Sequence, residues 1–467
     1  MSIIGNNLLA GSSGGAAGYQ IQRSLRINSA DSPILSRTPG SAGNRRKFTC
    51  SAWVKRSGIL KSLIDVPLLS AGDGTNFGIS GTGALGSTYD GRFYIRNGGS
   101  NLCKIPNTVF RDLSAWYHFV LIIDTENSTA ADRQILYVNG SRQENFDGSF
   151  TQNTDTNINT TTVHTIGVGL VTSANSSYSG NFLLAEYNFI DGQALTPSDF
   201  GETDSDTGAW IPKKYSGSYG TNGFYLNFSD NSGVTATTLG KDSSGNGNNW
   251  TPNNFSVTAG AGNDSLEDTP TNNWCTLNPL NRGSDNPTVS NGNLYLSSPS
   301  TDHTVVATFA IPSSGKWYWE YSKTANANLM SGIIHSPETG GLNTYLGGQN
   351  NGYSVYATNG QKYTGAIGNQ TYMATPPTST TITIAFDADT NKLYFGADGN
   401  WGDGSGNTDE TFANAAVAYT VPTGNTYYPA ISFNGGNAFA NFGQRAFDHT
   451  PPAGYKALNT ANLPVPT

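Results

Sequence analysis

Two acidic side chains in the stretch 182–191 raise the question of glycoside hydrolysis. On a strand, that chemistry needs carboxylates spaced like Glu-x-Asp-x-x-Glu, so that both groups face one cleft about 5 Å apart. Glu186 and Asp191 are five positions apart, which predicts opposite faces of a strand, and the Glu-x-Asp-x-x-Glu pattern occurs nowhere in the chain. The five histidines are scattered along the sequence. We therefore expect no catalytic residues and no enzyme activity.

Several turns rich in Asp and Asn offer oxygen atoms of the kind that bind Ca²⁺. The segments 73–76, 204–206 and 242–246 each supply several such oxygens, and Asp242 and Asn246 are the strongest candidate metal ligands. The same sequences are typical of Asx turns, in which the side chain bonds nearby backbone. Both interpretations stay open at this point. The sequence requires no cofactor, and calcium is the ion that these loops suit.

Three tryptophans, Trp210, Trp250 and Trp401, lie in segments rich in Gly, Asn and Asp, which favours surface loops. An exposed indole beside amide groups can bind the face of a sugar by CH–π contact and hydrogen bonding. These residues are therefore candidate ligand-binding residues. The alternative is that each indole anchors its loop against the rim of the fold. Four other tryptophans lie in strand-like segments and are expected in the core: Trp53, Trp116, Trp317 and Trp319.

The charge distribution is uneven along the chain. Charged residues make up only 12% of the 467 residues, and the net charge of −8 argues against nucleic-acid binding. Residues 1–47 nevertheless hold six basic residues against one acid, a net charge of +5. We interpret this excess as an arm that docks onto an acidic partner, with a solvated strand edge as the alternative. The candidate anchoring residues are Arg23, Arg26, Arg37, Arg45 and Arg46.

The cysteines and the apolar runs limit the class of protein further. Cys50, Cys103 and Cys275 are far apart and show no CxxC spacing, so the sequence predicts neither a disulfide framework nor a zinc site. No run approaches the roughly 20 apolar residues of a membrane span. The first residues lack the basic and apolar regions of a signal peptide. An extracellular-type body without these signals fits a protein that is released by cell lysis.

Alternation of polar and apolar residues predicts an all-β protein with two β-sandwiches of jelly-roll type. Residues 48–54 alternate, and residues 116–124 are nearly continuously apolar, as expected for a central strand. Residues 317–321 and 382–386 alternate in the second half. The predicted segments are an extended N-terminal anchoring arm (1–45), a first sandwich (46–200), a Gly/Asn/Asp-rich connector (201–275), a second sandwich (276–458) and a tail (459–467).

The first predicted sandwich holds a series of short motifs in a distinctive order: FTCSAWVK at 48–55, WYH at 116–118, LYVNG at 136–140 and AEYNFIDGQALT at 185–196. With these motifs it resembles the concanavalin A-like (LamG-type) family. The resemblance covers roughly 150 residues, and its specificity lies in the order and spacing of motifs that are individually weak. It implies a jelly roll whose loops often hold Ca²⁺.

The second predicted sandwich holds the motifs GKWYWE at 315–320, GII at 332–334, TITIAFD at 381–387, LYF at 393–395, YPAI at 428–431 and NFG at 441–443. With these motifs it resembles a SPRY domain, which is also a bent β-sandwich. Asp398-Gly399 stands near the usual Asn-Gly turn of that family, and a long Gly/Asp/Asn insertion follows to Asp409. Loop-borne recognition known for SPRY domains therefore does not transfer to that region.

Three further motifs add to these resemblances: IDGQALTP at 190–197, WIPKKY at 210–215 and GKDSSGNGNNW at 240–250. With them the whole chain is similar to structural proteins of marine bacteriophages, especially those of cyanobacteria. In those proteins a glycine-rich leader, a LamG-like module and a SPRY-like module occur together. The resemblance implies a location at the virion surface, in a tail fibre, a capsid fibre or a decoration.

Three functions follow from these interpretations. The first is a virion attachment protein whose arm binds other virion proteins and whose sandwiches bind a host-surface glycan or receptor. The second is a purely structural capsid decoration or fibre component without glycan binding. The third is a polysaccharide depolymerase, which the absence of paired carboxylates disfavours. We expect a homo-oligomer, although no coiled-coil heptads are present, and neither nucleic-acid binding nor membrane insertion.

Overall fold

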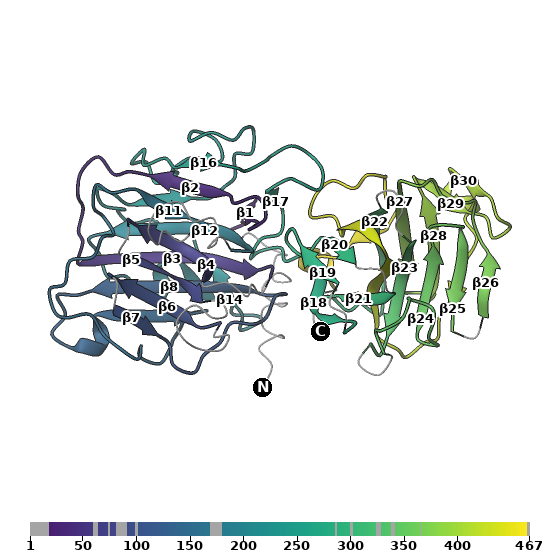
Figure 1. The fold of residues 1–467 in the computed structure, drawn as a ribbon, viewed down its shortest axis with the longest axis horizontal. Coiled ribbons are helices and arrows are strands. Elements are labelled where there is room, and N and C mark those ends of the chain that lie inside the picture. The colour runs from purple at the N-terminus through teal and green to yellow at the C-terminus, as the bar shows by residue number, and fades with distance from the viewer. Residues whose placement is uncertain are drawn as a thin grey trace. The chain divides into compact units, whose positions relative to one another are not determined.

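The chain divides into two compact units, Met1–Asn273 and Trp274–Thr467 (Figure 1). In the described part of the chain the regular elements are β-strands and short 3-10 turns, without an α-helix, so the predicted all-β fold class is confirmed. No helix there is long and apolar enough to span a membrane. The computed structural model describes residues 18–58, 64–72, 75–80, 91–98, 101–168, 180–284, 287–298, 302–323, 328–337, 341–365 and 367–464.

The first unit contains two antiparallel sheets and a small ribbon. Short 3-10 turns lie at η1 (Ala130–Asp132) and η3 (Pro197–Asp199). The strands are β1 (Ser24–Ile27), β2 (Ile34–Arg37), β3 (Lys47–Arg56), β4 (Ile64–Ala71), β5 (Thr75–Ser80), β6 (Phe93–Asn97), β7 (Asn101–Lys104), β8 (Trp116–Asp124), β9 (Gln134–Val138), β10 (Ser141–Arg142), β11 (His164–Ile166), β12 (Phe182–Asp191), β13 (Gly201–Thr203), β14 (Trp210–Pro212), β15 (Phe224–Leu226), β16 (Thr251–Asn253) and β17 (Ser265–Leu266).

The sheets of the first unit form a sandwich. Sheet A has the strand order β10-β9-β8-β3-β12-β1-β17, with β15 also paired to β12. Sheet B has the order β16-β2-β11-β4-β5-β6-β7, and β13 and β14 form the ribbon. The apolar positions of β3 at Phe48, Cys50, Ala52 and Val54 belong to the core between the sheets, as their alternation predicts. Trp53, from the same strand, packs on the opposite, outer face of sheet A.

Residues 201–273 cover part of the outer face of sheet A and also enter the core between the sheets, where Phe224, Leu226 and Trp250 are buried. They supply the β13–β14 ribbon and strands β15, β16 and β17, so the predicted connector (201–275) belongs almost entirely to the first unit. Its scattered apolar residues explain the difference, because they are buried on that outer face or in the core. The two buried clusters on this face include Trp53, Trp116, Leu183 and Leu266, and Val120, Ile122, Phe200, Tyr219 and Tyr225.

The segment predicted as an anchoring arm (1–45) is also part of the fold from residue 18 onward. β1 pairs with β12 and β17, and β2 pairs with β11 and β16. Leu25, Ile27 and Leu35 are fully buried in the core. The idea of a segment that orders only in an assembly is therefore wrong for residues 18–45. Residues 1–17, with the glycine-rich stretch, lie outside the described part.

The second unit also contains two large sheets. Short 3-10 turns lie at η4 (Phe412–Asn414) and η5 (Thr460–Asn462). The strands are β18 (Leu277–Arg282), β19 (Thr288–Ser290), β20 (Tyr295–Ser298), β21 (His303–Ala307), β22 (Lys316–Lys323), β23 (Asn328–His335), β24 (Gly352–Tyr356), β25 (Gln361–Thr364), β26 (Ile367–Thr371), β27 (Thr380–Asp387), β28 (Lys392–Ala397), β29 (Asn400–Gly402), β30 (Thr408–Asp409), β31 (Tyr419–Thr420), β32 (Tyr427–Asn434), β33 (Gly436–Asn441) and β34 (Lys456–Ala457).

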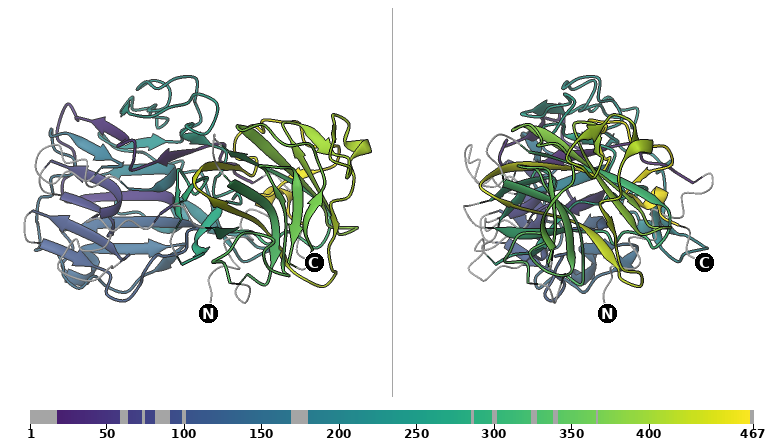
Figure 2. Two further views of the ribbon diagram at one scale, coloured as in Figure 1. Left: turned by 45° about the vertical axis from the view of Figure 1, so that its right-hand side comes forward. Right: turned by 90° about the vertical axis from the view of Figure 1, so that its right-hand side faces the viewer.

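Sheet C of this unit has the order β18-β21-β32-β23-β24-β25-β26. Sheet D has the order β19-β20-β33-β22-β27-β28-β29-β30, with β31 on β28 and β34 on β22. Figure 2 shows the sheets of both units from two further sides. Trp317, Trp319 and Tyr321 of β22 are buried, as predicted for an alternating strand. Trp274 forms a bridge with Asn459, so part of the predicted tail (459–467) belongs to this fold.

Candidate functional site

Two of the three candidate sugar-binding tryptophans are buried. Trp250 is fully enclosed in the core of the first unit, with its ring 4.9 Å from that of Phe224. Trp401 is 4% exposed, and its ring lies 4.7 Å from that of Phe412. The prediction that they offer an exposed face to a ligand is therefore wrong. The alternative is correct, because each indole packs its polar loop against the sandwich.

The third candidate, Trp210, is half-buried beside a histidine. Its indole N–H donates to Nδ1 of His118 at 2.9 Å. Nε2 of His118, at 2.9 Å from Ser51 Oγ, therefore carries the proton and donates it to the serine. Burial lowers the pKa of His118 to about 3, so the ring stays neutral. A histidine in this tautomer cannot take the proton of Ser51. His118 therefore does not act as a base that activates Ser51 as a nucleophile.

The predicted calcium ligands have other partners. Asp242 is 6% exposed. One carboxylate oxygen accepts hydrogen bonds from the backbone N–H groups of Tyr225 and Ser244, and the other accepts from Ser244 Oγ and the N–H of Asn248. Asn246 donates its amide to two backbone carbonyls. In the described part no group of three or more acidic, histidine or cysteine residues could hold a metal. Asp242 and Asn246 therefore build an Asx-type turn, and their assignment as a metal site is corrected.

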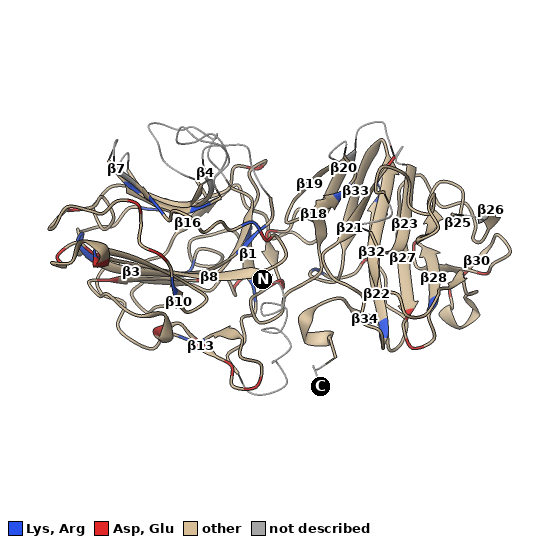
Figure 3. Ribbon diagram, turned by 90° about the horizontal axis from the view of Figure 1, so that it is seen from below, with Lys and Arg blue, Asp and Glu red and all other residues tan. Residues whose placement is uncertain are grey.

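The candidate anchoring arginines all have partners within the first unit. Arg26 is 1% exposed and lies 3.0 Å from Asp264, so it cannot contact a docking partner. The docking role of the other four stays a prediction. Figure 3 shows the charged residues scattered over both units. The remaining contacts join Arg23 to Glu267, Arg45 and Arg46 to Asp155, and Arg37 to Asn222 and Asn248.

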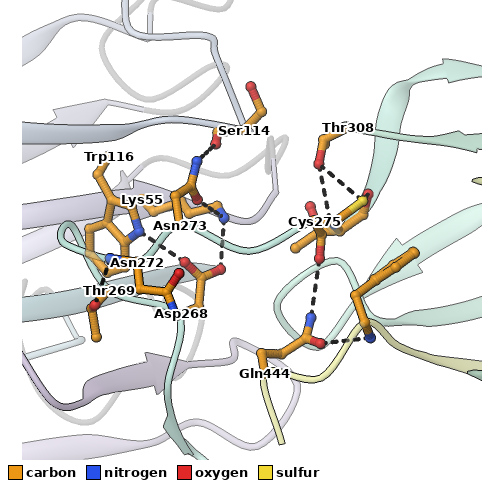
Figure 4. A network of polar contacts seen from close by, with 12 residues as sticks. Lys55, Ser114, Trp116, Asp268, Thr269, Asn272, Asn273, Cys275, Thr308 and Gln444 are labelled. Atoms are coloured by element: carbon orange, nitrogen blue, oxygen red, sulfur yellow. Dashed lines mark hydrogen bonds and ion pairs between the residues drawn. The ribbon is translucent and has the colours of Figure 1, made fainter. Parts of the chain in front are cut away.

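A buried polar network ties the end of the first unit to sheet A (Figure 4). Lys55 of β3 and Asp268 are both 1% exposed, with 2.7 Å between Nζ and Oδ2. The indole of Trp116 donates to the second oxygen of Asp268 at 2.9 Å, and Lys55 also donates to Asn273. Asn273 in turn donates to the carbonyl of Ser114. Every group of this network has a partner, so we interpret it as structural.

The carboxyl of Glu186 is buried on the outer face of sheet A. Glu186 lies at a bulge of β12, with φ of +49°, and is 6% exposed. Its oxygens accept hydrogen bonds from the phenols of Tyr19 at 2.7 Å and Tyr225 at 2.8 Å. Asp191, its candidate catalytic partner, instead accepts from the N–H groups of Asn44 and Asn222. The two carboxylates thus do not form a catalytic pair.

Burial raises the pKa of Glu186 to about 7. The two phenol oxygens of Tyr19 and Tyr225 are also only 2.6 Å apart, which closes a triangle of three short contacts. Three hydrogen bonds need three protons, and the two phenols supply only two. The carboxyl supplies the third when it is protonated. The short contact between the two phenols therefore favours a protonated Glu186, and a pKa of about 7 keeps its carboxyl mostly neutral below pH 7.

An open, aromatic site lies on the second unit instead. A hollow of about 200 Å³ opens on the outer face of sheet C, and we call it the tyrosine hollow. A second hollow of about 490 Å³ is lined by Phe386 and Tyr427, but both side chains are at most 4% exposed and present no ring face. The lining of the tyrosine hollow is Asp302, Asn328, Met330, Tyr345, Tyr356, Tyr363 and Asn434.

The strands of sheet C position most of this lining. Met330 of β23 pairs with Tyr356 of β24, and Asn328 of β23 pairs with Asn434 of β32. Leu329, between Asn328 and Met330, is fully buried on the inner face. Side chains alternate along a strand, so Asn328 and Met330 point outward together. The hollow is thus built on regular sheet, which fixes its shape.

Two of the tyrosines, Tyr345 and Tyr356, each stand at right angles to the third, Tyr363. The ring of Tyr363 is 6.3 Å from that of Tyr345 at 85°, and 5.9 Å from that of Tyr356 at 87°. Tyr356 donates its hydroxyl to Asn328 at 2.9 Å, and Tyr363 donates to Gln361 at 3.0 Å. These edge-to-face contacts and hydrogen bonds hold the rings in place. Tyr345 remains 37% exposed at the rim.

The loop that carries Tyr345 lies across the outer face of sheet C. Thr304 donates its hydroxyl to the carbonyl of Thr344 at 2.8 Å. The hydroxyl of Ser432 accepts from the N–H of Leu346 at 2.7 Å, and the hydroxyl of Ser354 donates to the carbonyl of Leu346 at 2.6 Å. Hydroxyl groups of three strands, β21, β32 and β24, thus secure the loop. Sequence reasoning missed this site, although alternation in residues 328–334 and 352–356 could have placed Met330 and Tyr356 on one face.

Comparisons with known proteins agree with this architecture. Residues 29–199 match the family described as the concanavalin A-like lectin/glucanases superfamily. No curated protein is significantly similar to the chain in sequence. Among solved structures, the SPRY domain of human HERC1 matches at 17% identity over 35% of this chain and 96% of that domain, with a TM-score of 0.28.

Two further solved structures are similar to part of the chain. A candidate carbohydrate-binding protein from Bacteroides ovatus matches at 14% identity, 50% of this chain and 59% of that one, with a TM-score of 0.34. A SAP-like pentraxin from Limulus polyphemus matches at 15% identity, 38% of this chain and 80% of that one, with a TM-score of 0.28. The chain thus contains a concanavalin A-like module over residues 29–199, and its second unit is a further β-sandwich.

Proposed function

We propose that the protein is a non-catalytic glycan-binding protein and that the tyrosine hollow is its binding site. The observation that carries this proposal is a set of ordered aromatic faces beside amide groups, open to solvent at Tyr345. Aromatic rings with a few convergent polar groups are the usual composition of small-molecule sites. The concanavalin A-like module of the first unit gives the same expectation of a lectin-like protein.

The hollow suits one pyranose ring. The apolar C–H face of the sugar would pack on Tyr345 or Tyr363, whose rings make a right-angled corner. The amides of Asn328 and Asn434 would bind the hydroxyl groups at the sugar edge. A shallow, partly hydrated site of this size supports a dissociation constant of about 1 mM, or about −4 kcal/mol. Useful affinity would then come from several copies on one particle.

Hydrolysis is disfavoured at this site because a glycosidase uses two carboxyl groups flanking the scissile bond. The lining of the hollow has one carboxylate, that of Asp302. In the first unit, Glu186 and Asp191 have separate partners. The described residues therefore favour binding without bond cleavage.

We also propose that the protein is displayed at the surface of a bacteriophage particle, in a tail fibre, capsid fibre or adhesin. The motifs at 190–197, 210–215 and 240–250 support this setting. Purified particles should contain the chain by mass spectrometry, and antibodies against it should label intact particles in electron micrographs. Its absence from purified particles would contradict this part of the proposal and leave the binding site untouched.

The binding proposal is tested with the full chain by saturation-transfer NMR against neutral monosaccharides and on a glycan array. Tyr345→Ala should weaken binding about tenfold or more because it removes one ring face. Tyr345→Phe should keep most of the affinity, since it retains that face. Tyr295→Ala, on sheet D outside the hollow, is the matched control. Wild-type affinity in Tyr345→Ala, or no sugar binding by the wild type, would refute the proposal.

A further inference from the structure

We propose that the tyrosine hollow selects sugars that carry a free ammonium group, such as a 2-amino-2-deoxy pyranose, over N-acetylated, neutral and acidic sugars. This inference rests on the proposed glycan binding at the same site. It depends on one charged side chain, Asp302, and on the chemistry of the groups around it. The lining contains no lysine, arginine or histidine.

The position of Asp302 follows from strand register. Asp302 directly precedes β21, whose first residue, His303, pairs with Phe433 of β32. Asp302 therefore comes level with Asn434, and Asn434 pairs with Asn328 of β23. One carboxylate and two amides thus form a row across three neighbouring strands at one end of sheet C. A sugar on the tyrosines would meet this row with its polar edge.

The charge of Asp302 has no compensation among the described residues. The Asp302 side chain is partly exposed in the hollow, and no described residue forms a hydrogen bond or an ion pair with its carboxylate. The neighbouring stretches 299–301 and 324–327 contain no lysine or arginine in the sequence. A ligand cation would supply the missing charge. A uronic or sialic acid would place a second negative charge beside the first, which costs affinity.

The tyrosine rings favour the same ligand. The faces of aromatic rings attract cations, and a cation over an exposed tyrosine gains about 0.5–1 kcal/mol. Because Tyr345 and Tyr356 are both perpendicular to Tyr363, ring faces point in more than one direction around the hollow. An ammonium group can therefore contact a ring face and the Asp302 carboxylate while the pyranose packs on another ring. N-acetylation removes the charge and both contributions.

The experiment compares four probes on the full chain by NMR titration at low ionic strength and about pH 6, where a sugar amine is protonated. The probes are glucosamine, N-acetylglucosamine, glucose and glucuronate. We expect glucosamine to bind about three- to tenfold more tightly than glucose or N-acetylglucosamine, and glucuronate to bind least. Raising the salt concentration should reduce the preference, since a partly exposed ion pair is screened.

Asp302→Asn should remove the preference for glucosamine and keep glucose binding, because the amide retains the shape and hydrogen-bonding capacity of the side chain. Glu410→Gln, an exposed acid outside the hollow, is the matched control and should keep the preference. Equal binding of glucosamine and glucose by the wild type would overturn this inference alone. A preference that survives in Asp302→Asn would do the same. Failure of all four sugars to bind would overturn the proposed function as well.

Discussion

Replacing Glu186 by Gln should change how the stability of the first unit depends on pH. Glutamine has nearly the shape of a protonated glutamic acid and keeps a donor and an acceptor for Tyr19 and Tyr225. It cannot lose a proton. The left-handed backbone at this position, φ of +49°, is equally strained for both residues. The substitution therefore isolates the titration of one buried carboxyl.

The magnitude follows from the two pKa values of Glu186. Burial raises the pKa from 4.5 in the unfolded chain to about 7 in the fold. Between these values the folded state binds the proton and the unfolded state releases it, so stability falls as pH rises through this window. Each pKa unit corresponds to about 1.4 kcal/mol, which gives a penalty of about 3 kcal/mol that is absent below the window and complete above it.

Other groups titrate in the same pH range, so the quantity to compare is the difference in unfolding free energy between variant and wild type. Burial lowers the pKa of His118 to about 3 and that of His164 to about 4, and both residues destabilise the fold as pH falls below 6.5. Hydrogen bonds from Tyr19 and Tyr225 and the nearby charge of Lys214 lower the pKa of Glu186 and oppose burial, and the value of about 7 already includes them. The contributions of the two histidines are shared by wild type and variant and cancel in their difference.

The assay is urea unfolding of the full chain at several pH values, with the transition of the first unit identified by hydrogen exchange in peptides of β3, β8 and β12. Relative to wild type, Glu186→Gln should gain about 3 kcal/mol between the acidic and the alkaline end of the window. Glu202→Gln, at an exposed position of β13, should show a constant difference. A pH-independent difference for Glu186→Gln would refute the argument that the carboxyl is neutral in the fold.

Two more substitutions test the buried polar contacts of the first unit. Asp242→Ala should lower the unfolding free energy of that unit by about 3 kcal/mol, because it leaves buried donors unpaired. Asp230→Ala, at a partly exposed turn, should cost much less. EDTA should leave the melting temperature of the wild type unchanged. Lys55→Met should cost about 3–5 kcal/mol by leaving Asp268 buried without its cation. Lys47→Met, which loses two partly exposed ion pairs on the same strand, should cost at most about 1 kcal/mol. Chemical denaturation measures the unfolding free energy of each variant. Equal losses for Asp242→Ala and Asp230→Ala, or for Lys55→Met and Lys47→Met, would contradict the role assigned to the buried contacts.

Local patterns in the sequence predicted the central strands well. The apolar run at 116–124 is β8 with the same bounds. Asn139 and Gly140 both have positive φ and turn the chain from β9 to β10, as the Asn-Gly pair predicts. These features depend on neighbours in sequence, which a single sequence shows directly.

Contacts between distant residues account for the failures. Trp250 and Trp401 lie in polar loops, and composition alone does not say whether a loop folds back on its sheet. β1 pairs with β12, more than 150 positions later, so its weak alternation carried little information. The tyrosine hollow is more dispersed still, since its lining extends from Asp302 to Asn434. Only the register of five strands brings those residues together.

The covering of each outer face explains why the proposed binding site lies on sheet C. On sheet A, Tyr19 and part of residues 201–273 fill the outer face, and the aromatic side chains there become a second core. On sheet C, the loop 341–350 covers only part of the outer face, and three tyrosines remain at its edge. Aromatic side chains on the outer face of a sheet thus stabilise the fold where another segment covers them. Where no segment covers them, they can bind a ligand. In a chain with 12% charged residues, the uncompensated carboxylate of Asp302 then determines which ligand fits.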